Sequence, residues 1–292
     1  MRITDSMTFS LVLQGQNRSS RRLLDASRSA STGERVSAPS DDPVAWAAAV
    51  NHESRISRLE SRSSTVGRAA DDLAGAESML DQAGAYVQQA REIALASANG
   101  SVDPNTRASL SRQINDLRTG LLGIANTRGA NGFLFAGTRT DTAPFTTAGA
   151  FTGNDTPLSV EIADGVSIRA NASGARAFTT AGGRDLFADL QSLANALTAN
   201  NLTDIRSAIT NLDAGHQQIV NARVDAGIGV ERLRSASEVA DTARTAAVTA
   251  RARAVEGDFP TVLSELTNAR AAYERNIAVT REILQVSSIN RF

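Results

Sequence analysis

The sequence predicts a mainly α-helical fold: a folded-back, coiled-coil-like helical rod built from both chain halves, with a small β-rich insertion in the middle. Residues 1–128 and 184–292 are rich in alanine and carry apolar side chains at a seven-residue spacing. The stretch between them, 131–180, is instead rich in Gly, Thr and Phe. Two helical halves that flank a small insertion must fold back on each other, so we expect both termini to lie at the same end.

Heptad columns support the two helical halves. Apolar residues that recur every seven positions keep one seam facing a partner helix and impose a left-handed supercoil. Many of these positions are alanine, and burying one methyl group contributes only about 0.8 kcal/mol, so stability must come from length or from neighbouring subunits. The first column is Leu59, Val66, Leu73, Leu80, Val87 and Ala94, with Ala69, Ala76, Ala83 and Ala90 as its companion; the second is Ile205, Leu212, Ile219, Ala226, Leu233, Ala240, Ala247 and Ala254.

Composition excludes several classes of protein. Net charge is −1, which gives no broad field to attract nucleic acid or an anionic membrane. Cysteine is absent, which excludes thiol nucleophiles, disulfides and Cys-based zinc sites, and every basic residue is Arg, which excludes catalytic lysines. We therefore expect no enzyme, no cofactor and no metal.

Hydropathy alone predicts a cytoplasmic protein. No apolar run approaches the ~18 residues that a membrane-spanning helix needs. The N-terminus also lacks a cleavable secretory signal, since Phe9 to Leu13 is a short apolar core and Asp5 precedes it. An export system that reads uncleaved N-termini would escape both tests.

The first half divides into a terminal segment, a loop and two helices. Residues 3–30 are polar and weakly amphipathic, and a loop follows that ends at Asp42, a natural N-cap with Pro43 at the first helical position. One helix is expected over 43–98, stopping at Asn99-Gly100. A second starts at Asp103-Pro104 and ends near Gly129.

The sequence of residues 131–180 predicts β structure, and that of residues 184–292 predicts helices. A β-hairpin is expected over 131–147 and a second small β unit over 158–180, where apolar and polar residues alternate. Helices are expected from Arg184 to about 199 and from Leu202 onward, with a break at Gly257 and Pro260.

The two terminal segments have only each other as partners. Residues 261–290 form an amphipathic helix with no partner in the chain except residues 3–30. Two marginal helices with one apolar stripe each cannot make a thick core as a pair, so we expect them to order when many copies bundle. The expected assembly interface is Ile3, Met7, Leu11, Leu24, Leu263, Leu266, Tyr273, Ile277 and Leu284.

Polar candidates for chemistry favour structural roles. His52 and His216 have no carboxylate or nucleophile spaced to orient them, Asp41-Asp42 suits a helix cap, and Asp71-Asp72 suits a solvated helix face. Gly227-Ile228-Gly229 lies within a helical pattern, which favours close helix approach or a bend over a nucleotide loop. The cluster of Arg18, Arg21 and Arg22 fits either a solvated helix face or a contact with a partner subunit, a chaperone or acidic residues of an export path.

Several segments resemble the flagellin superfamily. The loop at 31–43 is similar to its N-terminal motif, residues 90–100 to its first rod helix, and residues 222–233 to its Arg-Gly-Arg-Leu pattern. Residues 132–145 resemble the hairpin of the branch that forms the hook–filament junction. Val230 and Glu231 replace the Gln-Asn of flagellins, which disfavours flagellin itself. The motif residues are Thr32, Gly33, Arg35, Ser40, Asp41, Asp42, Pro43, Arg91, Gly132, Phe135, Gly137, Arg223 and Arg232.

The resemblance implies a structural subunit of the bacterial flagellum, exported unfolded through the flagellar type III apparatus. Its expected partners are hook-associated protein 1, flagellin, the filament cap protein during assembly, a cytoplasmic export chaperone and further copies of itself in a ring. Its expected place is the extracellular hook–filament junction after a transient cytoplasmic stage, with neither nucleic acid nor membrane as a partner.

Pattern and resemblance together predict three parts. They are terminal helices that order as an inner tube on assembly (1–42 with 259–292), a helical rod domain with the hairpin (43–145 with 184–258), and a small β-rich outer insertion (146–183).

Two other interpretations stay open. Flagellin, the bulk filament subunit, is disfavoured by the short middle segment and by the hairpin motif. A cytoplasmic coiled-coil adaptor would share the heptads without being exported.

Overall fold

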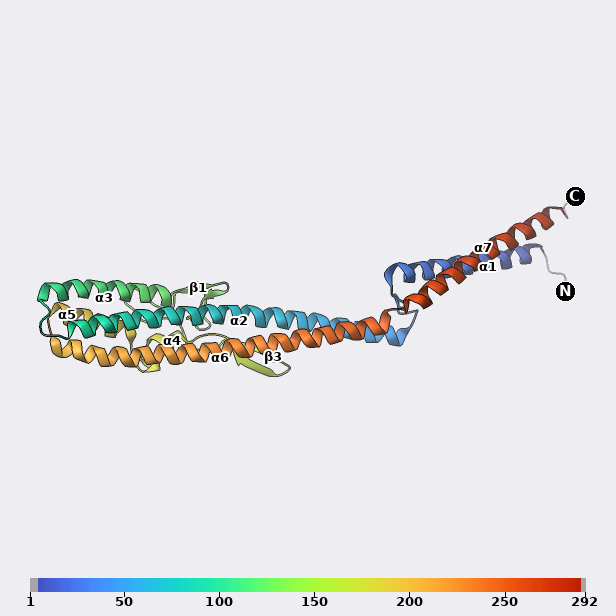
Figure 1. Ribbon diagram of the computed structural model, residues 1–292. Coiled ribbons are helices and arrows are strands. Elements are labelled where there is room, and N and C mark those ends of the chain that lie inside the picture. Colours follow the sequence, from blue (N-terminus) through green and yellow to red (C-terminus); the bar gives the residue numbers. More distant parts are fainter. Residues whose placement is uncertain (1–4, 290–292) are drawn as a thin grey trace. The chain divides into compact units, whose positions relative to one another are not determined.

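The computed structural model describes the backbone of residues 5–289 and the side chains of residue 7 and residues 9–283. Within that range the chain is mainly helical with two small two-stranded sheets, which confirms the predicted fold class (Figure 1). It divides into two compact units: unit 1 is Met1–Arg58 with Ala243–Phe292, and unit 2 is Leu59–Thr242. The elements are α1 (Asp5–Thr32), α2 (Pro43–Ser97), α3 (Pro104–Ala125), β1 (Arg128–Gly129), β2 (Gly132–Phe133), β3 (Ser159–Ala163), β4 (Val166–Arg169), α4 (Gly174–Phe178), the 3-10 helix η1 (Thr180–Gly182), α5 (Leu186–Thr198), α6 (Leu202–Val255) and α7 (Phe259–Ile289).

The centre of unit 2 is the seam between α2 and α6, which lie side by side (Figure 1). The heptad prediction is confirmed from Leu59 to Ala94 and from Ile205 to Ala247, where every predicted position is at most 9% exposed, while the last position, Ala254, is only partly buried. Small residues bring the helices close: a Cβ at Gly84 would lie 3.7 Å from both His216 and Ile219. The expected close approach at Gly227–Gly229 is also confirmed, since a Cβ at Gly229 would crowd the side chain of Leu73.

Charged pairs fix the register of this seam. Arg223 on α6 contacts Asp81 at 2.5 Å and Glu77 at 3.6 Å on α2, and Arg91 on α2 pairs with Asp213 on α6. Because the α6 partner moves toward the N-terminus as the α2 residue moves toward the C-terminus, the helices are antiparallel. Exposed pairs contribute at most about 1 kcal/mol each, so they specify alignment more than they stabilise it.

Arg107 joins two turns at one end of unit 2. Its guanidinium, 2% exposed, donates to the backbone oxygens of Ser97 at 3.2 Å and Asn99 at 2.7 Å and to the side chain of Asn200. These carbonyls lie at the C-terminal end of α2, where the helix dipole favours a cation. One buried side chain therefore holds the α2–α3 turn against the α5–α6 turn.

The predicted hairpin over 131–147 is wrong in position. The paired strands are β1 and β2, which place Arg128 opposite Phe133, while Phe145 forms only an isolated bridge with Phe151. The reason is a competing contact: the side chain of Asn126, at the end of α3, makes two hydrogen bonds of 3.0 Å with the backbone of Phe145. Helix α3 also ends at Ala125, earlier than the predicted stop near Gly129.

The second β unit is confirmed in part. Strands β3 and β4 pair antiparallel, but residues 174–178, predicted as β structure, form helix α4. The side chain of Ser173 accepts a hydrogen bond of 3.1 Å from the backbone N–H of Arg176, which caps and starts this helix. The expected solvated role of Asp72 is also wrong, because its carboxylate accepts hydrogen bonds from Ala130 and Asn131.

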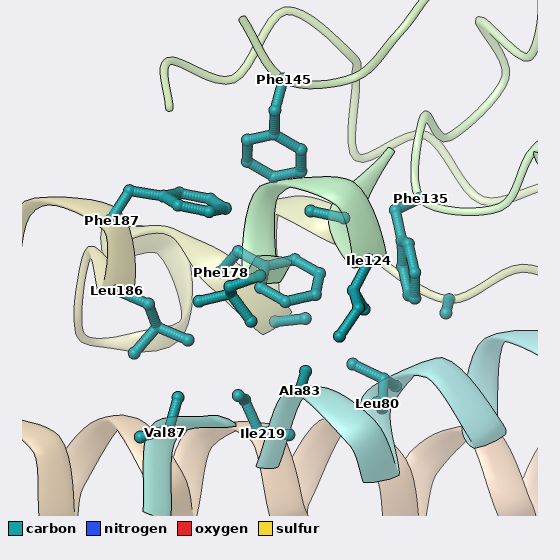
Figure 2. Close-up of a cluster of buried hydrophobic side chains, with 14 of the residues drawn as sticks. Leu80, Ala83, Val87, Ile124, Phe135, Phe145, Phe178, Leu186, Phe187 and Ile219 are labelled. Atoms are coloured by element: carbon teal, nitrogen blue, oxygen red, sulfur yellow. The ribbon is translucent and has the colours of Figure 1, made fainter. Parts of the chain in front are cut away.

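Four phenylalanines pack the middle segment onto the helices of unit 2 (Figure 2). The ring of Phe178 lies 5.3 Å from Phe135 and 5.6 Å from Phe145, both nearly perpendicular, and Phe145 lies 5.2 Å from Phe187. Edge-to-face pairs of this kind are favourable beyond the area they bury. Residues 146–183 therefore share the core of unit 2 with Leu80 and its neighbours.

A single glutamine anchors the turn that follows. Gln218 on α6 is 6% exposed, and its amide nitrogen lies within 3.2 Å of the backbone oxygens of Ala177, Thr179 and Arg184. Its side-chain oxygen accepts a hydrogen bond of 2.8 Å from the backbone N–H of Arg184. Buried polar atoms need such partners, so Gln218 fixes the path of 177–184 across α6.

Gly137 and Gly165 offer a matched test of the packing of the middle segment. Both have positive φ, 71° and 75°, so alanine at either adds backbone strain of about 1–2 kcal/mol. A Cβ at Gly137 would overlap the backbone oxygen of Asn154, whereas a Cβ at Gly165 meets open space. We expect Gly137→Ala to lower the free energy of unfolding by about 1–3 kcal/mol more than Gly165→Ala, measured by urea titration. Equal losses would show that the loop around Asn154 moves aside freely.

Candidate functional site: an assembly interface

Unit 1 is built on the pairing of α1 with α7. The least exposed positions of α1 include Val12, Ser19 and Ala26, which are seven residues apart, and those of α7 include Leu266 and Tyr273, also seven apart. Two heptad stripes thus face each other. The expectation that the last helix has the N-terminal segment as its partner is confirmed.

The stripe that α1 presents to α7 is thin and partly polar. Ser19 is only 5% exposed, and its hydroxyl oxygen finds no hydrogen-bond partner among the described residues. Ala26 contributes a single methyl group, while Val12 and Leu23 are only partly buried. An apolar contact of this size contributes little free energy, because the hydrophobic effect scales with the apolar area that is removed from water.

Large apolar side chains on the other faces of α1 lie open to solvent. Met7 and Leu11 are 58% and 59% exposed, and Phe9 and Leu24 are 52% and 63% exposed. At 100° per residue, Met7 and Leu11 lie on one flank of the α7-facing stripe and Phe9, Leu13 and Leu24 on the other. A surface helix normally shows one apolar stripe, so further apolar flanks mark surfaces that await partners.

The structure divides the nine predicted interface residues into two groups. Met7, Leu11, Leu24 and Leu263 are exposed, whereas Leu266, Tyr273 and Ile277 are partly buried in or beside the α1–α7 seam. The side chains of Ile3 and Leu284 lie outside the described residues.

Sequence reasoning missed four exposed apolar residues on the terminal helices: Phe9, Leu13, Phe259 and Val279. Phe9 and Leu13 are four residues apart and therefore share a helix face, a signal that was available in the sequence. The expectation of one apolar stripe on each helix does not include this second apolar face of α1.

The 31–43 motif forms a tight turn between α1 and α2. Gly33 has a φ of 76°, which only glycine adopts without strain, and its oxygen accepts a hydrogen bond of 2.9 Å from the N–H of Gly257. The N–H groups of Arg35 and Val36 donate to the oxygen of Val255 at 2.7 and 3.1 Å. The turn is thereby tied to the segment that joins α6 to α7.

Two aspartates hold this turn from inside. Asp41 accepts hydrogen bonds from the backbone N–H groups of Ser37 at 3.0 Å and Ala38 at 2.9 Å, and these lower the pKa of its carboxyl group. Asp42 caps α2, as predicted: it accepts from the N–H groups of Ala45 and Val44, and the bond from Ala45 is the main cause of its lowered pKa. The adjacent aspartates are therefore local structural anchors.

A small core and one arginine complete the base of unit 1. Val36 and Val255 are buried with Ala49, and Trp46 packs against them. Arg251 on α6 contacts Glu53 at 2.9 Å and Glu34 at 3.4 Å, which links α6 to α2 and to the turn. The turn is thus rigidly supported, while the α1–α7 pair beyond it buries little.

The remaining motif residues lie in unit 2, where most have packing roles. Arg91 and Arg223 form the ion pairs of the α2–α6 seam, and Phe135 is fully buried. Gly132 and Gly137 have positive φ and no room for a side chain. The last motif residue, Arg232, is exposed on α6.

Among the described residues, no group of three or more His, Asp or Glu side chains is placed to hold a metal ion. None of the helices in that range has the length and apolar character needed to cross a membrane. The exposed apolar side chains on α1 and α7 make unit 1 the candidate site for contact with other protein chains.

Comparison with known proteins agrees with this geometry. Residues 4–140 match the family model described as the bacterial flagellin N-terminal helical region. The chain is 36% identical over 150 residues to flagellar hook-associated protein 3 of Escherichia coli, which is 50% of this chain and 46% of that protein. It is 29% identical over 186 residues to the protein of the same name from Salmonella typhimurium, covering 62% and 57%. The chain therefore spans about half the length of the curated relatives it matches.

Solved structures share the fold. A protein of Vibrio parahaemolyticus assigned to the flagellar hook-associated proteins superposes with a TM-score of 0.68 at 21% identity, over 74% of this chain and all of that one. Hook-associated protein 3 of Legionella pneumophila gives a TM-score of 0.61 at 15% identity, over 68% and 97%.

Over the superposed part of the chain, the fold is similar to that of these flagellar hook-associated proteins. The resemblance to flagellar hook-associated protein 3 and to the flagellin superfamily is confirmed by the matched family region and by the curated relatives.

The lowered pKa values of Asp41 and Asp42 predict acid sensitivity of the turn. A carboxyl group whose pKa is lower in the folded state stabilises the fold above its unfolded value of about 3.9, and this stabilisation is lost as pH falls through the folded-state pKa. We expect the melting temperature of unit 1 to drop below about pH 4, and Asp41→Asn to lower it at neutral pH and to flatten this drop.

Trp46, the only tryptophan, lies beside the turn and reports on unit 1 by its fluorescence. The control is Asp71→Asn, an exposed aspartate on α2 with no hydrogen bond or ion pair among the described side chains. An Asp41→Asn profile that matched the control would contradict the assigned role.

Proposed function

We propose that this chain is a structural subunit of the bacterial flagellum that forms the junction between hook-associated protein 1 and the flagellin filament. The observation that carries the proposal is the α1–α7 pair, whose large apolar side chains remain exposed on the flanks of both helices. The similarity to flagellar hook-associated protein 3 supports the place of the chain in the flagellum.

In this proposal the terminal helices, residues 1–42 with 259–292, order fully when copies bundle into an inner tube. Burying a Leu, Phe or Met side chain contributes about 1.5–3 kcal/mol, so side chains that are half exposed in one chain gain a large part of that value on contact. The interface comprises Ile3, Met7, Leu11, Leu24, Leu263, Leu266, Tyr273, Ile277 and Leu284.

The rest of the chain would form the wall and the outside of the junction. Residues 43–145 with 184–258 serve as the helical rod that packs laterally, and residues 146–183, which pack onto this rod through Phe178, lie on its outer side. The subunit would leave the cell unfolded through the flagellar type III apparatus, after a cytoplasmic chaperone has held its C-terminal helix. The filament cap protein would act during assembly on the same ring of copies.

Flagellin, the bulk filament subunit, is a second candidate. It is favoured by the match of residues 4–140 to a region described for flagellins. The curated relatives, which are named hook-associated protein 3, favour the junction instead. Abundance separates the two, since a flagellin dominates sheared filaments and a junction subunit is a trace component.

Deletion of the gene tests the junction role directly. We expect flagellin to be lost to the culture medium while cells keep bare hooks, because the filament has no base on which to grow. Normal filaments on the deletion strain would contradict the proposal. Absence of flagellin-like material from both the medium and the cells would identify the chain as the filament subunit.

A point variant tests the interface without disturbing the fold. Leu24 is 63% exposed, so Leu24→Ser should change the free energy of unfolding by less than about 0.5 kcal/mol, yet it should fail to restore filaments in the deletion strain. The matched control is Leu95→Ser, at a residue that is 45% exposed on α2 in unit 2. Full rescue by Leu24→Ser would remove this flank of α1 from the interface.

A further inference from the structure

Unit 2 carries one concentrated apolar surface, a groove between the β3–β4 hairpin and α6. Ile162 and Ile168 form its hairpin wall, and Val224, Ile228 and Val239 form its helical wall, where they are 54%, 47% and 67% exposed. Besides these three and the adjacent Val166, the large exposed apolar residues described in unit 2 are Leu95 and Leu158. An apolar surface gathered in this way marks a contact site.

The surface that contacts this groove is not another face of unit 2. The described exposed side chains on α3 and α5 are polar or small, so unit 2 offers no second apolar surface of this size. Unit 1 does: eleven of the seventeen large exposed apolar side chains in the described part of the chain belong to it.

Charge points the same way. Unit 1 contains 15 arginines and 11 acidic residues and is net positive, whereas unit 2 contains 15 arginines and 20 acidic residues and is net negative. At the groove, Glu231 forms an ion pair of 3.6 Å with Arg234 and Arg232 lies beside it, while the carboxylates Asp225 and Glu238 lie near the two ends. Neither Asp225 nor Glu238 has an ion pair among the described side chains.

One segment of unit 1 matches the groove in spacing, apolar character and charge. The first four turns of α2 expose Val44 at 80% and Val50 at 47%, and they end in the exposed arginines Arg55 and Arg58. Neither arginine has an ion pair among the side chains that the structure describes. The segment therefore presents an apolar end and a cationic end on one helix.

The spacing is the same on both sides. Val44 and Arg58 are fourteen residues apart, and so are Val239 and Asp225, and Val224 and Glu238. Fourteen helical residues span about 21 Å. Whichever way the segment runs along α6, Val44 meets a valine and Arg58 meets a carboxylate.

From these observations we infer that residues 44–58 of one copy dock in the groove between α6 and the β3–β4 hairpin of a second copy. The contact joins two different surfaces, so it is heterologous and can be repeated from copy to copy, as a ring or tube requires. The inference rests on the proposed function, which it deepens by naming two surfaces through which copies meet.

The chain has no cysteine, so disulfide capture between single-cysteine variants tests the contact. Ile228→Cys and Val50→Cys full-length proteins are mixed at high concentration with a mild oxidant, and covalent dimers are measured on gels. We expect dimers in the mixture at least several-fold above those of Ile228→Cys alone. The control partner is Ser109→Cys, an exposed position on α3, which should give only background with Ile228→Cys.

Charge reversal provides the second readout. Arg58→Glu in the Val50→Cys protein should lower the dimer yield several-fold, and Asp225→Arg together with Glu238→Arg in the Ile228→Cys protein should restore it. Dimers of Ile228→Cys with itself would show that two grooves face each other and would overturn the inference. A mixture no better than the Ser109→Cys control would overturn it too. If the deletion strain still loses its filaments, the failure is confined to this contact and leaves the junction role intact.

Discussion

The antiparallel seam between α2 and α6 is the constraint on which the rest of unit 2 depends. Its heptad positions alternate leucine, isoleucine and valine with alanine, so the helices come close but bury little per turn. The seam gains stability by its length and by the elements laid on it. The phenylalanine cluster supplies the wide apolar contacts that alanine cannot, and Gln218 fixes the chain that carries it.

Unit 1 follows the opposite logic. Its turn is densely hydrogen-bonded through Asp41, Asp42 and the oxygen of Val255, and Arg251 braces it with two ion pairs. The seam of the α1–α7 pair includes the buried hydroxyl of Ser19, which has no hydrogen-bond partner among the described residues, and larger apolar side chains lie outside this seam. A rigid turn that carries an incompletely buried helix pair suits a subunit whose last folding step is contact with its neighbours.

The sequence predicted those features that repeat or that depend on local chemistry. Heptad spacing gave the α2–α6 seam, and Asp42-Pro43 gave the start of α2, because capping involves only nearby residues. The hairpin was misplaced because the side chain of Asn126 forms hydrogen bonds with the backbone of Phe145, nineteen residues away. A contact between residues so far apart leaves no local pattern in the sequence. Asp72 was misjudged for the same reason, since its partners lie in another element. On α1, the exposed residues Met7, Leu11 and Leu24 were predicted as interface residues, but Phe9 and Leu13 were not. These two residues share a helix face, and the prediction allowed only one apolar stripe on each helix.

Hydrogen–deuterium exchange on the purified monomer tests the central claim most directly. If α1 and α7 await assembly, their amides open with a free energy near zero, while amides of the α2–α6 seam in unit 2 approach the global stability. The account predicts exchange in α1 and α7 that is orders of magnitude faster than in residues 66–94 and 205–233, with strong protection gained in sheared flagella. Protection of α1 and α7 in the monomer equal to that of the seam would contradict it.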